Sequence, residues 1–213
     1  MKIFSDFEVH GDPDQLSRFV KVITDHLEAG WSRNLDGEEQ VRGHNLEMIS
    51  FSCASAQARP AADLWLAKRS TTCYYVANIV PAERGRLNHD EYNAILRDFY
   101  DRFASRSAQQ VGARAVLGKT DVAIEELVSE HAREKLRTFS QLANKSTGSS
   151  HSCDQERWFD FLVTVHRERS NLRARMLERW FVEHDGWSED VASDLAIEYE
   201  TARALLTYYD QPR

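Results

Sequence analysis

Residues 3–15 read IFSDFEVHGDPDQ, and they contain both kinds of secondary structure that the first half of the chain repeats. The side chains from Ile3 to Val9 alternate with a period of two, which is typical of a half-buried strand. Gly11 ends this strand, and the stretch DPDQ (12–15) supplies an N-cap acid, a first-turn proline and the glutamine of a capping box. The stretch therefore predicts a strand that is followed directly by a helix.

The rest of the first half alternates in the same way. Apolar residues at spacings of three and four continue the first helix to about Gly30, and Asn88 opens a second capping box and a second amphipathic helix. Between these helices, short runs of β-branched and aromatic residues predict strands, and residues 111–117 are the candidate for a last strand. The predicted strands between the helices are LEMISFSC (46–53), DLWLA (63–67) and CYYVANIV (73–80).

The order of these elements indicates the fold class. Strand, helix, two or three strands, helix and candidate strand follow one another in a way that is close to the split βαβ arrangement of ferredoxin-like domains. From Thr120 onward the sequence predicts helices only, at about 121–143, 154–184 and 188–209. We therefore predict an α+β fold, with a split βαβ, ferredoxin-like sheet domain at residues 1–118 and an all-helical domain at residues 119–213.

Composition limits the classes of partner and the compartment. The chain has 34 acidic and 27 basic residues and a formal net charge of −7, which disfavours a broad footprint on nucleic acid or on an anionic membrane, although a small basic patch is allowed. The amino terminus is acidic, and no apolar run approaches the about 20 residues of a membrane span. Three cysteines without a C-x-x-C pair fit reduced thiols. We expect a soluble, cytoplasmic protein that binds no membrane.

A polar segment precedes the second predicted helix of the second half: residues 144–158 read NKSTGSSHSCDQERW. Its hydroxyl groups suit an anion, Gly148 lets the backbone come close, and the next helix aims free amide groups at the ligand. In this hypothesis residues 144–157 form a phosphate site. The ligand-binding residues are Lys145, Ser146, Thr147, Ser149 and Ser150, and the catalytic residues are His151, Asp154 and Arg157.

The acidic residues of the same segment favour a plain connector between helices. Asp154 and Glu156 lie in the first turn of the predicted helix, where carboxylates are themselves favourable and where they repel a phosphate. Their charge also cancels that of Lys145 and Arg157, and the P-loop pattern GxxxxGK[ST] is absent from the sequence. We therefore interpret the segment first as a connector, capped by Ser152 or Asp154, and second as a site.

One arginine interrupts the apolar stripe of the helix that follows. Arg169 continues this stripe, and an arginine buried there needs a carboxylate or carbonyl partner because an unpaired buried charge is costly. The acidic segment 183–200 offers such partners, so we expect two packed helices that are held in register by charge. Two alternatives stay open: Arg169 faces a polar cleft toward His166 or the 144–153 loop, or the helix breaks at Ser170-Asn171.

The stretch RWFVEH, from Arg179 to His184, has the R-x4-H spacing. It resembles the motif of HEPN ribonucleases, helical proteins in which an arginine and a histidine act on RNA phosphodiesters across a dimer. That resemblance implies that Arg179 and His184 are catalytic. The chain departs from the family at Trp180, where a polar residue is usual, and the same spacing recurs at Arg84–His89, in a predicted loop and cap. The alternative is a salt-bridged Arg179 and a His184 that interacts with the helix dipole.

No metal and no cofactor is predicted. None of the eight histidines has a second histidine four residues further on, and the G-x-S-x-G, G-x-G-x-x-G and kinase patterns are missing from the sequence. Serine hydrolase and nucleotide-fold interpretations therefore lack support.

These observations favour a regulatory or protein-interaction function in the cytosol, with a protein partner or a homodimer, and nucleic acid binding is allowed but not favoured. The alternative is a phosphodiesterase or ribonuclease-like enzyme that uses one of the two candidate sites. The positive support for a partner is a surplus of aromatic residues, some of which would act as anchors. They are Trp31, Trp65, Tyr74, Tyr75, Trp158, Trp180, Trp187, Tyr208 and Tyr209.

Overall fold

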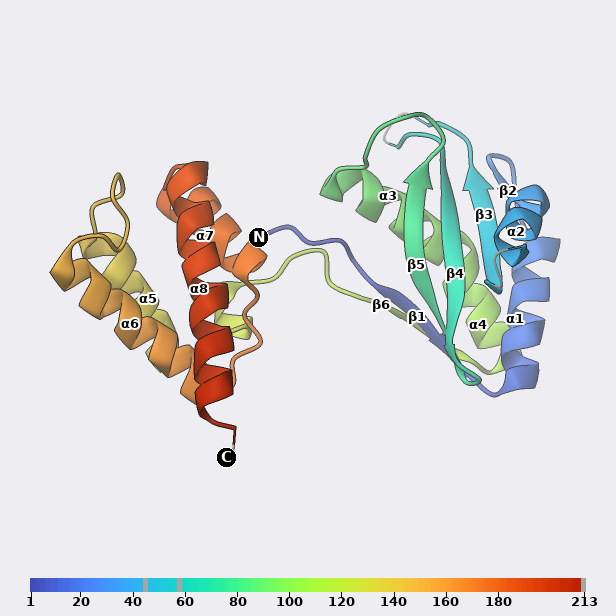
Figure 1. The fold of residues 1–213 in the computed structure, drawn as a ribbon. Helices are drawn as coiled ribbons and strands as arrows, with labels where there is room; N and C mark the ends of the chain where they lie inside the picture. The colour runs from blue at the N-terminus through green and yellow to red at the C-terminus, as the bar shows by residue number, and fades with distance from the viewer. Residues whose placement is uncertain (44–45, 57–58, 212–213) are drawn as a thin grey trace. The chain divides into compact units, whose positions relative to one another are not determined.

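The computed structural model describes residues 1–43, 46–56 and 59–211, and its secondary structure is mixed α and β (Figure 1). The chain divides into two compact units. One unit is Lys2–Asp121, and the other is Val122–Arg213 together with Met1. The division falls between Asp121 and Val122, whereas the sequence places the domain boundary after residue 118.

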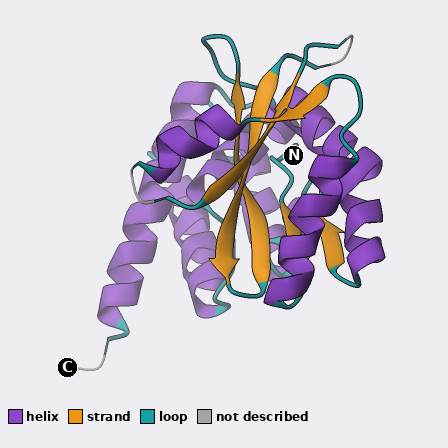
Figure 2. Cartoon of the chain, turned by 90° about the vertical axis from the view of Figure 1, so that its right-hand side faces the viewer, coloured by secondary structure: helices purple, strands orange, loops and turns teal. Residues whose placement is uncertain are grey.

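The first unit, called the α+β unit below, is built on a curled six-stranded sheet (Figure 2). Neighbouring strands are antiparallel in the order β2-β3-β4-β5-β1-β6. The strands are β1 Phe7–His10, β2 Trp31–Arg33, β3 Met48–Cys53, β4 Ala62–Ser70, β5 Cys73–Pro81 and β6 Arg114–Leu117. The helices are α1 Pro13–Asp25, α2 Leu35–Arg42 and α3 His89–Phe99, and α3 continues through the π-helical turn η1 Tyr100–Ala104 into α4 Ser105–Val111.

The ferredoxin-like topology is only partly visible in this order. The connection from β5 through α3 and α4 to β6 encloses β1 and is a split βαβ unit. The connection from β1 through α1 to β2, however, passes over three strands, β5, β4 and β3. The specific ferredoxin-like arrangement is therefore not confirmed.

Two elements of the α+β unit were not predicted. Strand β2 has three residues, and α2 buries only Glu38, so neither leaves an apolar period in the sequence. Helix α2 begins instead on a polar signal, since the Asn34 side chain accepts a hydrogen bond of 2.9 Å from the Gly37 amide. The predicted last strand is shorter than expected, because Val111 ends α4 and β6 spans only residues 114–117.

The core of the α+β unit is organised around one phenylalanine on α3. The Phe99 ring is fully buried, and its centroid lies 6.3 Å from Phe7, 5.2 Å from Trp31, 5.1 Å from Phe51 and 6.1 Å from Phe103. These rings come from β1, β2, β3 and η1, so one side chain joins the sheet to the helices. Aromatic clusters of this kind contribute about 0.5–1.5 kcal/mol per pair beyond area burial.

The second unit, called the helical unit below, consists of η2 Ile124–Glu126, α5 Glu130–Leu142, α6 Ser152–Arg167, α7 Ala174–Asp185 and α8 Glu189–Tyr209. Helix α5 packs on α6, and α8 packs on both α6 and α7. Its core is also aromatic, and the polar atoms of two buried rings are hydrogen-bonded. Trp187 Nε1 donates to Ser140 Oγ at 2.7 Å, and the Tyr199 hydroxyl donates to the Leu172 carbonyl at 2.8 Å.

The expectation that Arg169 lies on a buried stripe of one helix over 154–184 is wrong. Helix α6 ends at Arg167 and α7 begins at Ala174, and Arg169 is an exposed residue with a left-handed φ of 52°. The Ser170 hydroxyl stabilises the break, because it donates to the Leu127 carbonyl at 2.7 Å and accepts from the Leu172 amide at 3.1 Å. The helix is therefore broken near Ser170, as the second alternative predicted. Because Arg169 is not buried, the charge pairing expected for a buried arginine does not apply.

One buried carboxylate holds the edge of the sheet together. Glu38 is 4 % exposed and accepts two hydrogen bonds from Arg33, Nε to Oε1 at 2.9 Å and Nη2 to Oε2 at 3.0 Å. Its Oε1 also accepts the Ser50 amide at 3.0 Å. The pairing of β2 with β3 ends at Arg33 and Phe51, so the Glu38 carboxylate satisfies the next amide of β3.

We predict that Glu38→Gln lowers the free energy of unfolding of the α+β unit by about 1–3 kcal/mol, because Arg33 loses a paired carboxylate in a buried site. Urea denaturation measures the change, and hydrogen exchange at β3 locates it. Glu47→Gln is the matched control. Glu47 is 80 % exposed and pairs with Lys68 at 3.3 Å, so its loss changes stability by less than about 0.5 kcal/mol. Equal effects of the two substitutions would contradict the structural role of Glu38.

Candidate functional site

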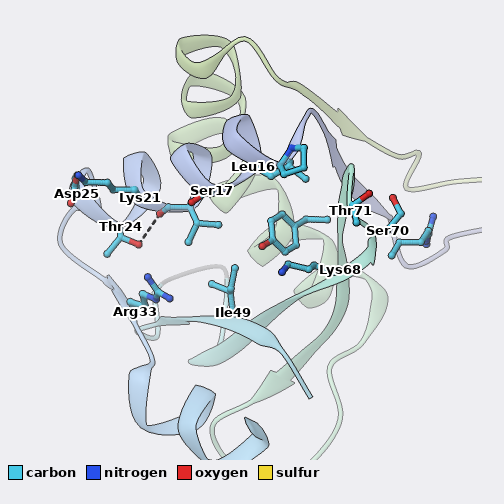
Figure 3. A pocket seen from close by; sticks show the side chains of 14 residues that line it. Leu16, Ser17, Lys21, Thr24, Asp25, Arg33, Ile49, Lys68, Ser70 and Thr71 are labelled. Carbon is cyan, nitrogen blue, oxygen red and sulfur yellow. Dashed lines mark hydrogen bonds between the residues drawn. The ribbon is translucent and has the colours of Figure 1, made fainter. Parts of the chain in front are cut away.

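A cleft of about 710 Å³ runs beside α1 in the α+β unit (Figure 3). One wall is α1 itself. The opposite wall is built from Arg33 at the end of β2, Ile49 on β3, Lys68 on β4 and Tyr74 on β5, and the turn between β4 and β5 closes one end with Ser70 and Thr71. Residues that are far apart in sequence therefore line one concave surface.

Helix α1 is fixed in place by the turn that the sequence predicts. Asp12 and Gln15 form the capping box, with the Gln15 amide 2.7 Å from Asp12 Oδ1 and the Asp12 amide 2.8 Å from Gln15 Oε1. The Gln15 side chain also donates to the Gly112 carbonyl at 3.0 Å, which ties α1 to the end of α4. The buried stripe of α1 faces the sheet, and its members Leu16 and Val20 line the cleft.

Four basic side chains line the cleft, but two of them are already neutralised. Arg33 is paired with buried Glu38, and Arg69 forms an ion pair with Glu8 and stacks on the Tyr75 ring with its guanidinium carbon 4.6 Å from the ring centroid. Both arginines therefore have partners that a ligand would have to displace.

The two lysines are more available. The pair of Lys68 with Glu47 is exposed, and a pair of that kind contributes about 0–1 kcal/mol, so an incoming anion can replace it. Lys21 is exposed and forms no ion pair with the residues that the structure describes. The cleft can thus present two ammonium groups to a guest, against one lining carboxylate, Asp25.

Three titratable groups of the cleft have pKa values that are raised above their ordinary values, further from neutral pH. The hydrogen bond to Glu47 raises the pKa of Lys68, and burial raises the pKa of the Tyr74 phenol. The hydrogen bond to Glu38 raises the pKa of Arg33. At neutral pH these groups are therefore two cations and a neutral hydroxyl donor, a set that binds and orients an anion.

Sequence reasoning missed this cleft. Lys68 lies on the same face of β4 as the buried residues Leu64 and Leu66, so a longer strand over residues 62–70 would have placed a lysine at the end of an apolar face. The predicted strand stopped at residue 67. Lys68 and Lys21 line the same cleft only because α1 packs across the sheet, and no local pattern contains that information.

The 144–151 segment is a series of hydrogen-bonded turns. The amides of Thr147 and Gly148 both donate to the Asn144 carbonyl, at 3.0 and 2.9 Å. Gly148 has a left-handed φ of 62°, which favours glycine, and a Cβ there would lie 3.3 Å from Val191 Cγ1, a tight contact with α8. The Ser146 amide donates to Asn144 Oδ1 at 2.9 Å.

Several polar groups of this segment point inward or are used within it. Ser149 is buried and its hydroxyl donates to Glu198 Oε2 on α8 at 2.8 Å. The Ser150 hydroxyl donates to the Thr147 carbonyl at 2.7 Å, and the Lys145 ammonium donates to the Asp185 carbonyl. Lys145, Ser146 and Ser149 are not among the residues that line the depression shared by the other candidates of this segment.

The remaining candidates meet in a shallow depression of about 630 Å³, which is lined by Thr147, Ser150, His151, Asp154 and Arg157 among others. Asp154 is 6 % exposed, and its carboxylate accepts Arg157 Nη1 at 2.7 Å and the Asn144 amide at 3.4 Å. The arginine that an anion would use is therefore already bonded to the neighbouring carboxylate. His151, and not Ser152 or Asp154, occupies the N-cap position of α6, and its side chain makes no capping hydrogen bond.

Arg169 contributes to a different depression, of about 450 Å³, that also includes His166, Arg203 and Asp210. His166 Nε2 lies 2.8 Å from Asp210 Oδ2, and Arg203 donates to the Leu172 carbonyl at 2.9 Å. Arg169 and His166 thus line one depression, and no residue of the 144–153 loop is among its lining residues.

Arg179 and His184 both lie in the uninterrupted helix α7. Arg179 is held by Glu183, with Nε 2.8 Å and Nη2 2.6 Å from Oε1, and His184 is exposed. At 3.6 residues per turn, side chains five residues apart point about 140° away from each other around the helix. The two residues therefore do not converge on one phosphodiester within a single chain.

Comparison of the chain with protein-family models, with curated proteins and with solved structures finds no match. Within the part of the chain that the structure describes, none of the helices has both the length and the apolar character that crossing a bilayer requires.

We predict that Asp154→Asn lowers the free energy of unfolding of the helical unit by about 1–3 kcal/mol, because Arg157 and the Asn144 amide lose their anionic acceptor in a buried site. Thermal and urea denaturation measure the loss. Glu156→Gln removes an exposed acid from the same helical turn and is expected to change stability by less than about 0.5 kcal/mol. A stable Asp154→Asn protein that retains turns 144–151 would show that Asp154 is not the anchor of this segment.

Proposed function

We propose that this protein is a regulatory binding protein whose α+β unit takes up a small organic anion in the cleft beside α1. The observation that carries the proposal is the position of Lys21 and Lys68 at the edge of an apolar floor formed by Leu16, Val20 and Ile49. A ligand pocket of this kind is usually apolar with a few polar groups that fix orientation.

The two parts of the lining favour an anion that carries an apolar body, such as an aromatic phosphate or carboxylate. Burial of apolar surface contributes about 25 cal/mol per Å², whereas an exposed ion pair contributes only about 0–1 kcal/mol. Inorganic phosphate would use the lysines alone and would bind weakly. The apolar floor therefore supplies affinity, and the lysines supply selection for negative charge.

Protonation states support binding in preference to catalysis. A general acid or base works best when its pKa lies near the working pH, and the pKa values of Lys68 and Tyr74 are both raised away from it. In the helical unit, the mutual pairing of Asp154 and Arg157 and the separation of Arg179 from His184 give little support to a phosphodiesterase or ribonuclease.

Phenyl phosphate is a suitable probe of the cleft, and inorganic phosphate is its comparison. In a titration followed by amide NMR shifts, we expect phenyl phosphate to bind more tightly and to shift residues 17–24 and 70–74. Lys21→Gln and Lys68→Gln should each weaken binding about threefold to tenfold. This loss lies between the free-energy contribution of an exposed ion pair and that of a charge-assisted hydrogen bond. Arg18→Gln is the matched control, because Arg18 is an exposed cation of α1 outside the cleft lining.

Two results would overturn this proposal. One is phenyl phosphate binding that is unchanged in both lysine variants or equally weakened by Arg18→Gln. The other is hydrolysis of RNA or of a phosphodiester by the purified protein that His151→Ala or His184→Ala abolishes while the thermal midpoint stays constant, a result that favours the enzyme alternative.

A second candidate function, self-association, is favoured by the surface of α8. Most of the aromatic residues considered as partner anchors belong to the cores, including Trp31, Trp158, Trp180 and Trp187. Exposed apolar side chains remain along α8 from its middle to its last turn. They are Ile197 at 59 %, Leu205 at 66 % and Tyr208 at 64 % exposure, and their spacing places them within about 80° of one another around the helix.

We propose a second copy of this chain as the occupant of that face, because a two-fold contact uses the same patch on both subunits. Size-exclusion chromatography with light scattering should then show a dimer that Leu205→Lys converts to a monomer. Leu142→Lys is the control, since Leu142 is 60 % exposed on α5 and is not part of the stripe. A monomer at every protein concentration, or equal disruption by the two substitutions, would exclude this contact.

A further inference from the structure

Three side chains with metal-binding atoms converge on the sheet. Glu8 and His10 are two residues apart on β1, so they project from the same face, and Cys73 lies opposite His10 in the pairing of β1 with β5. A carboxylate oxygen, an imidazole nitrogen and the Cys73 thiol sulfur all lie within 4.8 Å of one another. The neighbouring residues Phe7 and Val9 point into the core, so this group lies on the opposite face of the strand.

We propose that Glu8, His10 and Cys73 form a binding site for Zn²⁺, with a water molecule as the fourth ligand. Zinc binds sulfur, nitrogen and oxygen at about 2.0–2.3 Å, which places the donor atoms of a tetrahedral site about 3.3–3.8 Å apart. Glu8 Oε2 and His10 Nε2 are 2.9 Å apart, and the sulfur is within 4.8 Å of both. Small side-chain rotations therefore convert the observed group into a coordination shell.

The chemistry of the three ligands selects the metal. A thiolate with an imidazole favours zinc over magnesium or calcium, which prefer oxygen ligands. On binding, the Cys73 thiol releases its proton to solvent and the sulfur becomes a thiolate, while His10 binds through Nε2 and keeps its proton on Nδ1. The thiolate and the Glu8 carboxylate then supply two negative charges that balance the charge of the ion.

The surroundings hold the ligands in place. Strand β1 pairs with β5 on one side and with β6 on the other, so the backbone under Glu8 and His10 is fixed at both edges. Arg69 contacts Glu8 Oε1, which leaves Oε2 for the metal, and ligating carboxylates are commonly held by such an outer partner. Cys73 is a free cysteine that is buried at 6 % exposure, so its sulfur is shielded from disulfide partners.

The interpretation without a metal is a hydrogen-bonded Glu8–His10 pair beside a buried thiol. Cobalt distinguishes the two, because Co²⁺ bound to a thiolate absorbs strongly in the near ultraviolet through charge transfer. We expect protein that has been treated with chelator and dialysed to bind one Co²⁺ per chain with this absorption, and Zn²⁺ to displace it.

Variants identify the ligands. Cys73→Ser should abolish the charge-transfer band. His10→Gln and Glu8→Gln each remove a ligand, so each should weaken Zn²⁺ binding by more than about 100-fold, because loss of an outer partner alone weakens metal binding about 10- to 100-fold. Cys153→Ser and His26→Gln are matched controls, an exposed thiol and an exposed histidine outside the group, and should leave binding unchanged. Circular dichroism monitors folding, and the partly exposed Glu8 and His10 provide the test if Cys73→Ser misfolds.

The proposal is overturned if the wild-type protein shows no cobalt–thiolate absorption. It is equally overturned if the absorption survives in Cys73→Ser, or if His10→Gln and Glu8→Gln bind Zn²⁺ as tightly as the wild-type protein.

Discussion

Strand β1 is paired along both of its edges, with β5 on one side and β6 on the other, and the α+β unit depends on this constraint. Because the strand is central, its register cannot slip by one residue without exchanging Phe7 and Val9 in the core for Glu8 and His10. The Gly11 amide then donates to the Thr72 carbonyl at 3.1 Å, and Asp12 caps α1 immediately afterwards. One strand thus leads directly into α1, which is one wall of the cleft, and carries two of the three proposed zinc ligands.

Local signals in the sequence were sufficient where a single element carries its own information. The capping boxes at Asp12 and Asn88 are formed as expected, and both open helices. Such local signals do not predict which strands pair when the strands are far apart in sequence. Nothing in residues 3–9 specifies that the strand lies between β5 and β6, and α2 escaped detection because it buries a glutamate and not an apolar stripe. At Arg169 a charged residue interrupts an apolar helical pattern, and the helix ends just before it.

The same physical reason limits sequence-based prediction of the site. The contiguous polar residues of the 144–157 segment predict a site, but folding directs Ser149 and Lys145 to partners on or near other helices and pairs Asp154 with Arg157. The cleft residues are scattered from α1 to β5 and become neighbours only in the folded sheet. A dense polar run is thus a poor guide to a binding surface when its own charges can satisfy one another, and the residues that stay available are those with exposed partners, such as Lys68.

Arg69 connects the two proposed sites, because it lines the cleft and also pairs with Glu8. The Arg69 guanidinium reaches Glu8 and Tyr75 on the sheet face opposite the cleft. If anion binding shifted Arg69 so that this pair broke, the Glu8 carboxylate would lose its outer partner and the ligand geometry at β1 would loosen. The charge effect has the opposite sign, since removal of a nearby cation favours a bound Zn²⁺. Whichever effect is larger, equilibrium linkage requires that zinc change the affinity for the anion by the same factor as the anion changes the affinity for zinc. The β4–β5 connection carries Ser70 and Thr71 at the cleft and leads directly into Cys73, so a change in its backbone would act on both proposed sites.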